Sequence, residues 1–255
     1  MASVRRLIAR YALNGSTTDG SRNNHQATLH GSGAAYVEDD KIGKVLSLPG
    51  TGGAFLQLPA QVLEGADAVT VTGWVFLRST EPWQRFFDFG LNPETNFFCT
   101  PIGDAEDEGY RARITTSGWG EEQGPTAARV ATNRWVHLAV VLDATRRTLS
   151  IYRDGTRVGQ TTNVATKVEE LLDEEDARRT QLYVGKSRYD TDGYLNAKLH
   201  DAEHLGERSV GDAALRTHGA AVLSGDKLVR QTGGREMKIF AAMRSSFSFR
   251  VIMCP

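Results

Sequence analysis

The chain has 255 residues, and its 30 Lys and Arg against 31 Asp and Glu give a formal net charge of -1. A nearly neutral chain lacks the positive field that attracts nucleic acid or an anionic membrane, so we expect neither as a partner. Its 2 cysteines are too few for a disulfide-rich scaffold or a cysteine-based zinc cluster, while its 26 glycines predict many turns.

Short apolar runs recur along the chain with little helical pattern between them. Residues 69–77 alternate, with Val69 and Val71 on one face, which is the period of a strand. Asp154 and Gly155 join two further runs and are typical of a two-residue hairpin turn. The other predicted strands are 7–13, 27–29, 44–48, 54–58, 85–90, 96–100, 110–116, 135–142, 148–153, 157–161, 181–186 and 194–200. This series predicts an all-β protein, either an antiparallel sandwich or a barrel.

Three segments fit the pattern less well. Residues 167–179 are rich in charge, and we expect a solvated loop there. Residues 209–223 predict a short helix that Ser209 or Asp212 can cap. Residues 236–255 are apolar and predict either an extra edge strand or an irregular appendage.

The chain contains no motif of a hydrolase nucleophile elbow, a phosphate-binding loop or a helical zinc site. His200 and His204 have the i, i+4 spacing of helical metal ligands, but they fall at a predicted strand end, where that spacing separates residues by about 13 Å. Asp104, Glu106 and Glu108 have the spacing of paired acids on a strand, but they lie in an acidic, turn-like loop. We therefore assign no catalytic residue.

Several phrases stand in a definite order along the chain. They are VTVTGWV at 69–75, WQRFFDFG at 83–90, RWVHLAV at 134–140, YRDG at 152–155 and VGKSRY at 184–189. In this order the chain resembles the laminin G-like, concanavalin A-like jelly-roll domains of bacterial secreted proteins. Residues 83–90 are most similar to the modules attached to arabinofuranosidase-type glycoside hydrolases. The resemblance implies a two-sheet jelly-roll β-sandwich over residues 1–215 and leaves 216–255 as a tail of uncertain structure.

Domains of this family often hold one structural Ca²⁺ between an N-terminal loop and a closing acid. Asp19 and Asp201 match these two positions, so the resemblance implies a calcium site there. The alternative is that Asp19 only caps a turn.

The four tryptophans divide into two groups. Trp74, Trp83 and Trp135 fall on strand patterns, match core positions of the family and are expected in the core. Trp119 instead lies in a glycine-flanked polar loop, where an exposed ring can stack on the C–H face of a sugar. The alternative is that it anchors the loop on the rim of the sandwich.

A second polar and aromatic loop contains Arg188, Tyr189 and Asp192, which we take with Trp119 as candidate ligand contacts. The resemblance implies a non-catalytic module that binds a polysaccharide or oligosaccharide, or serves as an accessory to a glycoside hydrolase. One alternative is a polysaccharide lyase or glycoside hydrolase on the same fold, and another is a structural or adhesion module.

No stretch is long and apolar enough for a transmembrane helix, and residues 1–10 lack the apolar segment of a signal peptide. The resemblance implies an extracellular protein, whereas the sequence as a complete chain would be cytoplasmic. Cys99 lies in an apolar strand and is expected to be a buried thiol. Whether it meets Cys254 is left open.

Overall fold

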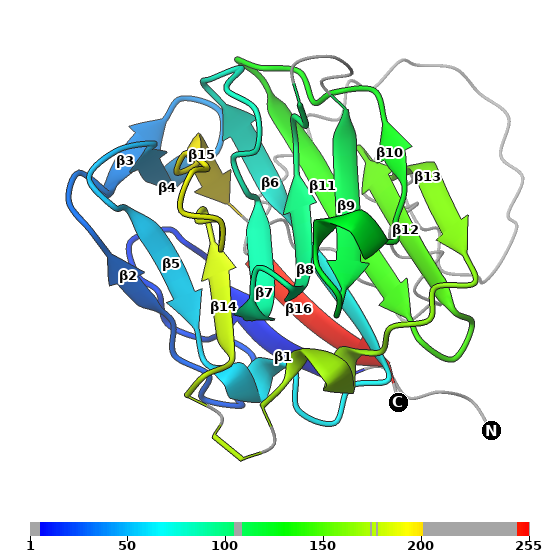
Figure 1. Ribbon diagram of the computed structural model, residues 1–255. Coiled ribbons are helices and arrows are strands. Elements are labelled where there is room, and N and C mark those ends of the chain that lie inside the picture. The colour runs from blue at the N-terminus through cyan, green and yellow to red at the C-terminus, as the bar shows by residue number, and fades with distance from the viewer. Residues whose placement is uncertain (1–5, 105–108, 174, 177, 201–248, 255) are drawn as a thin grey trace, which may run out of the picture.

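The structure, a computed structural model, describes residues 6–104, 109–173, 175–176, 178–200 and 249–254. Its strands form two antiparallel sheets that pack face to face (Figure 1). The predicted all-β, two-sheet sandwich is therefore confirmed, and the barrel is excluded.

Among the described residues the larger sheet has nine strands. Its main path runs through β13 (Thr156–Thr162), β12 (Thr148–Arg153), β11 (Trp135–Asp143), β6 (Ala68–Leu77), β15 (Asn196–His200), β4 (Gly43–Pro49) and β3 (Ala35–Asp39). Two more strands, β1 (Arg6–Tyr11) and β16 (Phe249–Cys254), join the sheet beside β6.

The smaller sheet has seven strands. Their order is β10 (Thr126–Ala127), β9 (Tyr110–Thr115), β8 (Thr95–Thr100), β7 (Phe87–Asn92), β14 (Gln181–Val184), β5 (Phe55–Leu58) and β2 (Thr28–His30). Three short 3₁₀ turns, η1 (Ala60–Val62), η2 (Trp119–Glu121) and η3 (Val168–Leu171), lie in the connections.

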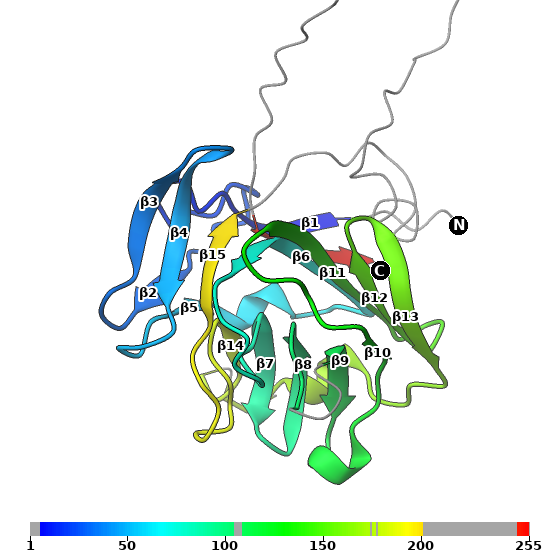
Figure 2. The same cartoon turned by 90° about the horizontal axis from the view of Figure 1, so that it is seen from above.

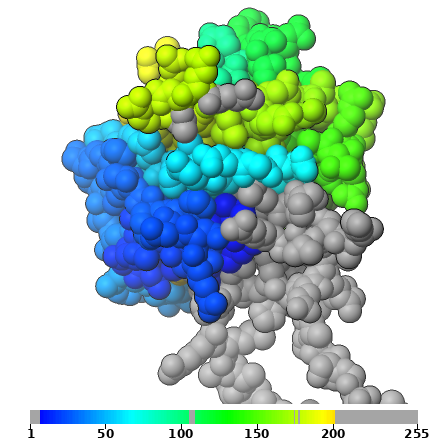
Figure 3. Space-filling view, turned by 90° about the horizontal axis from the view of Figure 1, so that it is seen from below, coloured from blue at the N-terminus to red at the C-terminus, as the bar shows by residue number. Residues whose placement is uncertain are grey.

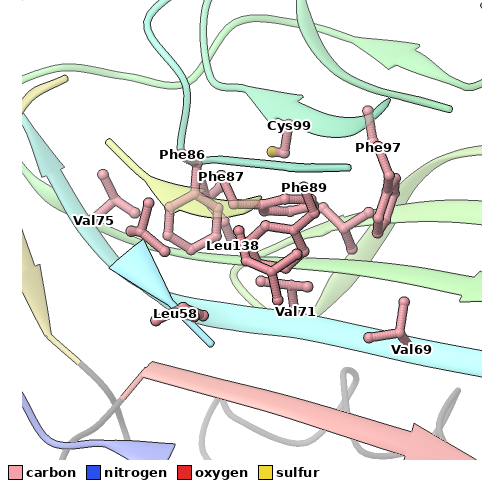
Figure 4. Close-up of a cluster of buried hydrophobic side chains, with 14 of the residues drawn as sticks. Leu58, Val69, Val71, Val75, Phe86, Phe87, Phe89, Phe97, Cys99 and Leu138 are labelled. Atoms are coloured by element: carbon pink, nitrogen blue, oxygen red, sulfur yellow. The ribbon is translucent and has the colours of Figure 1, made fainter. Parts of the chain in front are cut away.

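The two sheets enclose one continuous hydrophobic core. Val69, Val71 and Val75 of β6 are buried in it, as the alternation predicts, and they face Phe87 and Phe89 of β7 (Figure 4). Burying one such side chain stabilises a fold by about 1.5–3 kcal/mol, so this interface holds the two sheets together.

The expectation of a core position is wrong for Trp74, Trp83 and Trp135, which are only half-buried. Trp74 and Trp135 alternate along their strands with core residues, so their rings lie on the outer face of the nine-stranded sheet. Alternation shows which residues share a face, but here both faces carry large apolar side chains. Cys99, by contrast, is the buried free thiol that its strand predicts.

Residues 167–179 are not simply a solvated loop. Their acidic side chains Glu169 and Glu170 are exposed, but Val168 and Leu171 of η3 are 0% exposed and join the core. At this end of the sandwich η3 lies beside η1, and Figure 3 shows their surfaces adjoining in yellow-green and cyan. The two turns thus close the core at one end.

The strand β16 falls within the segment predicted as an edge strand or appendage, but it is an interior strand of the sheet. It pairs with β1 on one side and with the Ala68–Thr72 part of β6 on the other. The remaining part of β6 pairs with β15, and β11 runs along its opposite side. The predicted helix at 209–223 and the domain boundary at 215 lie outside the described residues.

Candidate functional site

The outer face of the seven-stranded sheet carries a row of buried polar and aromatic side chains. Phe87 and Phe89 point into the core, so Asp88 between them points outward. On the neighbouring strand β8, Phe98 pairs with Asp88, and Asn96 lies on the same face. Asp88 and Asn96 are 0% exposed and Phe98 is 1% exposed, so other residues cover this face.

The guanidinium of Arg85 lies over the ring of Phe98, 4.1 Å from its centroid, and the loop between β14 and β15 contributes to the cover of Asp88. Its Asp192 forms an ion pair with Arg85, in which an oxygen and a nitrogen lie 2.9 Å apart. The hydroxyl of Ser187 donates a hydrogen bond to the same carboxylate oxygen at 2.7 Å. The backbone N–H of Arg188 donates to Asp88 at 3.0 Å, so charged groups tie the loop to the sheet.

Two further contacts anchor the same loop. The guanidinium of Arg188 donates to the carbonyl of Gly90, and the hydroxyl of Tyr189 donates to the carbonyl of Pro93 at 3.0 Å. In the structure Arg188, Tyr189 and Asp192 lie in one loop, and their polar atoms hold that loop in place.

Arg85 and Asp88 bring opposite charges beneath this loop. Their side chains are 2% and 0% exposed, and Nε of Arg85 lies 3.4 Å from Oδ2 of Asp88. Burial raises the pKa of Asp88 to about 6, although the charges of Arg85 and Arg188 act in the opposite sense. The Oδ1 atoms of Asp88 and Asn96 accept no hydrogen bond from the described residues.

Trp119 stands on η2, in the connection from β9 to β10, and is 79% exposed. No other large apolar side chain in the described part of the chain is exposed in this way. The base of its loop is fixed, because Gly118 donates its N–H to the carbonyl of Glu94 at 3.0 Å and accepts the hydroxyl of Thr115 at 2.9 Å. Gly118 has a φ of 83°, which glycine adopts without strain.

The turn between β7 and β8 connects the two loops, because Pro93 and Glu94 bond to one loop each. Both loops stand out from the seven-stranded sheet on its outer side (Figure 2). Glu122 follows η2, and burial raises its pKa against the opposing charges of nearby arginines. Burial raises the pKa of the Tyr189 hydroxyl, and the negative charge of Glu122 acts in the same direction. We call Trp119, Glu122 and Tyr189 together the Trp119 surface.

An aromatic strip lies toward the β2 edge of the same sheet, and sequence reasoning missed it. The ring of His30 on β2 stacks on Phe55 of β5 with 4.7 Å between centroids. Phe55 meets the ring of Tyr183 on β14 edge-on at 5.1 Å, and the ammonium of Lys186 lies 4.7 Å from the centre of the Tyr183 ring. These residues come from distant strands, so no local sequence pattern could indicate them.

In this arrangement the carboxylate of Asp19 is held by hydrogen bonds from the protein itself. Its carboxylate accepts the backbone N–H groups of Arg10, Ser21 and His25, at 3.0, 2.8 and 2.9 Å. The hydroxyl of Ser21 adds a further hydrogen bond at 2.8 Å. These bonds use the roughly four lone-pair directions of a carboxylate. Asp201, the other predicted ligand, lies outside the described residues, which contain no cluster of three or more potential metal-binding side chains.

Residues 50–204 match the family model of the concanavalin A-like lectin/glucanases superfamily. The chain belongs to this superfamily. The resemblance inferred from the order of its sequence phrases is thereby confirmed. A comparison with curated proteins finds no match. None of the helices in the described part of this concanavalin A-like domain is long and apolar enough to cross a membrane.

Several solved structures share the fold. Domain 4 of AbnA, a GH43 extracellular arabinanase from Geobacillus stearothermophilus solved in complex with arabinotriose, is 19% identical with a TM-score of 0.58, and the match covers 77% of this chain and 92% of that domain. The botulinum neurotoxin serotype C1 binding domain is 12% identical with a TM-score of 0.54, and 77% of this chain spans 47% of it. The binding domain of botulinum neurotoxin DC in complex with SialylT is 10% identical, with a TM-score of 0.53 and coverages of 77% and 46%.

Proposed function

We propose that this concanavalin A-like domain is a non-catalytic carbohydrate-binding module whose ligand contacts the Trp119 surface. The observation that carries the proposal is the exposure of Trp119, a ring that is 79% exposed on an anchored turn. Tryptophan is enriched at binding interfaces, because its ring offers a large apolar face together with a polar N–H group, so an exposed Trp on an anchored turn favours a role in binding.

The chemistry of the surface suits a sugar. The C–H face of a pyranose or furanose stacks on an indole ring, and nearby polar groups bond to its hydroxyls. Glu122, three residues after Trp119, supplies a carboxylate, and Tyr189 adds a ring on the neighbouring loop. The net charge of -1 gives no reason for the chain to prefer a charged glycan, so we expect a neutral one.

Burial of the acids supports binding rather than catalysis. Asp88 and Glu122 both have a raised pKa on one face, and glycosidases use such pairs of carboxyl groups. Asp88, however, is 0% exposed beneath the loop between β14 and β15, so it does not reach a substrate in this conformation.

Titration of the full chain with arabinotriose, followed by a panel of neutral oligosaccharides, tests the proposal. Arabinotriose comes first because the arabinanase domain of the same fold was solved with it. We expect Trp119→Ala to weaken binding by at least about tenfold, the usual effect of removing a central aromatic contact. Trp119→Phe keeps a ring and should retain part of the affinity.

The control is Glu121→Ala, which changes an exposed neighbour on η2 without removing a ring. All three variants should melt at the wild-type temperature. Equal binding by Trp119→Ala and wild type would contradict the proposal. Release of shortened products from any polysaccharide would support the lyase or hydrolase alternative instead. An extracellular location is part of the proposal, and fractionation of the producing cells tests it.

A further inference from the structure

The β3–β4 hairpin curls over the outer face of the nine-stranded sheet. In the order of that sheet, β4, β15 and β6 separate β3 from β11. Four steps of about 4.8 Å would place β3 and β11 about 19 Å apart in a flat sheet. Nevertheless, Nε1 of Trp135 on β11 donates to Oδ2 of Asp39 on β3 at 3.3 Å. Figure 2 shows the hairpin rising beyond β15 on this side.

Three side chains form a floor under the hairpin. Lys198, Phe76 and Trp135 are direct partners across β15, β6 and β11, and they alternate with core residues, so all three point outward. The rings of Phe76 and Trp135 meet edge-on with 5.7 Å between centroids. The ammonium of Lys198 lies 5.0 Å from the centre of the Phe76 ring.

Asp39 fixes the hairpin above this floor. Its carboxylate lies 2.8 Å from Nζ of Lys198, and that side chain of Asp39 is only 8% exposed. The backbone N–H of Lys41 donates to its other oxygen at 3.1 Å. Burial tends to raise the pKa of Asp39, but the hydrogen bonds from Lys198, Lys41 and Trp135 outweigh it and lower the pKa. The charged form of Asp39 is therefore favoured, and it joins the hairpin to the floor through Lys198 and Trp135.

A hollow of about 150 Å³ remains between the hairpin residues Glu38, Asp39, Asp40 and Lys41 and the floor. A cavity of about this volume in another protein binds one benzene molecule, so the hollow has room for one small ring. The charges around it balance, because Asp39 is paired with Lys198 and Glu38 lies 3.9 Å from Lys44. Asp40 and Lys41 add one exposed charge of each sign. Such a wall offers both donors and acceptors without selecting an ion.

We propose that this hollow, which we call the hairpin pocket, is a second binding site that takes a single neutral sugar ring. The ring stacks on Phe76 or Trp135, and its hydroxyls bond to Asp40, Lys41 and Lys198. The choice of sugar as ligand rests on the proposed function, but the pocket itself does not. It lies on the opposite sheet from the Trp119 surface, so one short oligosaccharide does not reach both.

The test starts from the Trp119→Ala variant of the full chain, so that any remaining binding reports the pocket. The probe is methyl arabinofuranoside, which is a single ring, measured by saturation-transfer NMR and by tryptophan fluorescence. We expect binding to persist in Trp119→Ala and to fall at least about fivefold when Asp40→Ala and Lys41→Ala are added. Both added changes are on the exposed turn of the hairpin and leave the floor intact.

A second variant, Trp135→Ala, removes the ring itself and should abolish the remaining signal. Arg157→Ala, an exposed change on β13 at the far edge of the same sheet, serves as the matched control and should have no effect. Loss of all binding in Trp119→Ala alone would overturn the pocket and leave the proposed function standing. Binding that depends on the pocket but not on Trp119 would support the pocket and contradict the proposed function of the Trp119 surface. Displacement of the sugar by tetramethylammonium would show a cation site and also overturn the proposal.

Discussion

Asp19 holds together the loop that follows β1. Its carboxylate accepts N–H groups from both sides of that loop, and these bonds lower its pKa although burial acts to raise it. Asp19→Asn replaces one acceptor by an NH₂ group that faces another N–H. We expect a loss of about 1–3 kcal/mol in the free energy of unfolding, measured by urea denaturation.

The effect of Asp19 depends on pH in a defined direction. The pKa of Asp19 is lower in the folded protein than in the unfolded chain, where an Asp has a pKa of about 3.9. The contribution of Asp19 to the free energy of unfolding is therefore complete above that value and is lost as the pH falls below it. The difference between wild type and Asp19→Asn should therefore shrink in acid. A constant difference down to pH 2 would contradict this account.

Calcium at Asp19 and Asp201 stays a prediction that a chelator can decide. A bound ion stabilises the folded state, so EDTA should lower the melting temperature of a calcium-bound protein, and added calcium should restore it. Unchanged melting would leave the hydrogen bonds of Asp19 as the whole explanation of its position. Asp19→Asn supplies the control, since chelation should have no further effect in this variant.

The contribution of Asp88, which lies beside Arg85, to stability changes with pH in the opposite direction to that of Asp19. The pKa of Asp88 is raised to about 6, so between about pH 4 and 6 the folded protein binds more protons than the unfolded one. This residue therefore lowers stability as the pH rises through that window. We expect Asp88→Asn to flatten the curve of melting temperature between pH 4 and 6.

Removing only Arg85 leaves the buried Asp88 and the partly buried Asp192 without their shared cation. We expect Arg85→Met to cost about 3–5 kcal/mol in the free energy of unfolding at pH 7. The double variant Arg85→Met, Asp88→Asn should recover part of that loss, because one of the two uncompensated charges is gone. Equal stabilities for the single and double variants would show that the pair does not interact.

At the scale of the element, β16 is an interior strand whose pairing a single substitution can test. It donates and accepts hydrogen bonds on both sides, to β1 and to β6. Ile252→Pro removes one N–H from this ladder and cannot fit an interior strand. A loss of about 3 kcal/mol corresponds to a fall of roughly 6–12 °C in melting temperature for a domain of this size, measurable by calorimetry.

The control for this prediction is Ile252→Val, which keeps the backbone N–H and should melt within a few degrees of wild type. A proline variant that melts like the wild type would mean that β16 does not pair with β1 and β6 in solution.

Alternation was sufficient to predict β6, β11 and β12, because each of these strands has one face in the core. It missed β3, in which Glu38 and Asp39 read as part of a polar turn. The reason is that this strand lies at a sheet edge and uses its acids to reach the outer face. The same limit explains Trp135, since a strand pattern cannot tell a core ring from one under a folded-back hairpin.

The candidate site was predictable only where its signals are local. The glycines around Trp119 mark an exposed turn, and the loop with Arg188 and Tyr189 was recognised from its composition. Their partners were not, because Asp88 precedes Arg188 by 100 residues and only the sheet order brings them together. Non-local contacts of this kind leave no trace in one sequence.

At the scale of the whole molecule, the two proposed sites lie on the outer faces of opposite sheets. With both proposed sites, one module would bind two polysaccharide chains at once, and this would raise the effective affinity for a dense polymer without new contacts. We expect the wild-type protein to increase the particle size of soluble arabinan in light scattering.

Either Trp119→Ala or Trp135→Ala should abolish this increase, since bridging needs both sites. Growth of the particles in a single-site variant would show that another surface, or oligomerisation, connects the chains.

The position of β16 near the end of the chain also determines when the larger sheet can be completed during synthesis on the ribosome. Residues 249–254 are made about fifty residues after β15, which takes about 2–10 s at ordinary rates of translation. During that interval β1 lacks the strand that pairs with it in the described residues, and half of β6 offers an open edge. Nascent chains on adjacent ribosomes can exchange strands at the open edge of β6. A chaperone that recognises extended segments has several seconds in which to protect that edge.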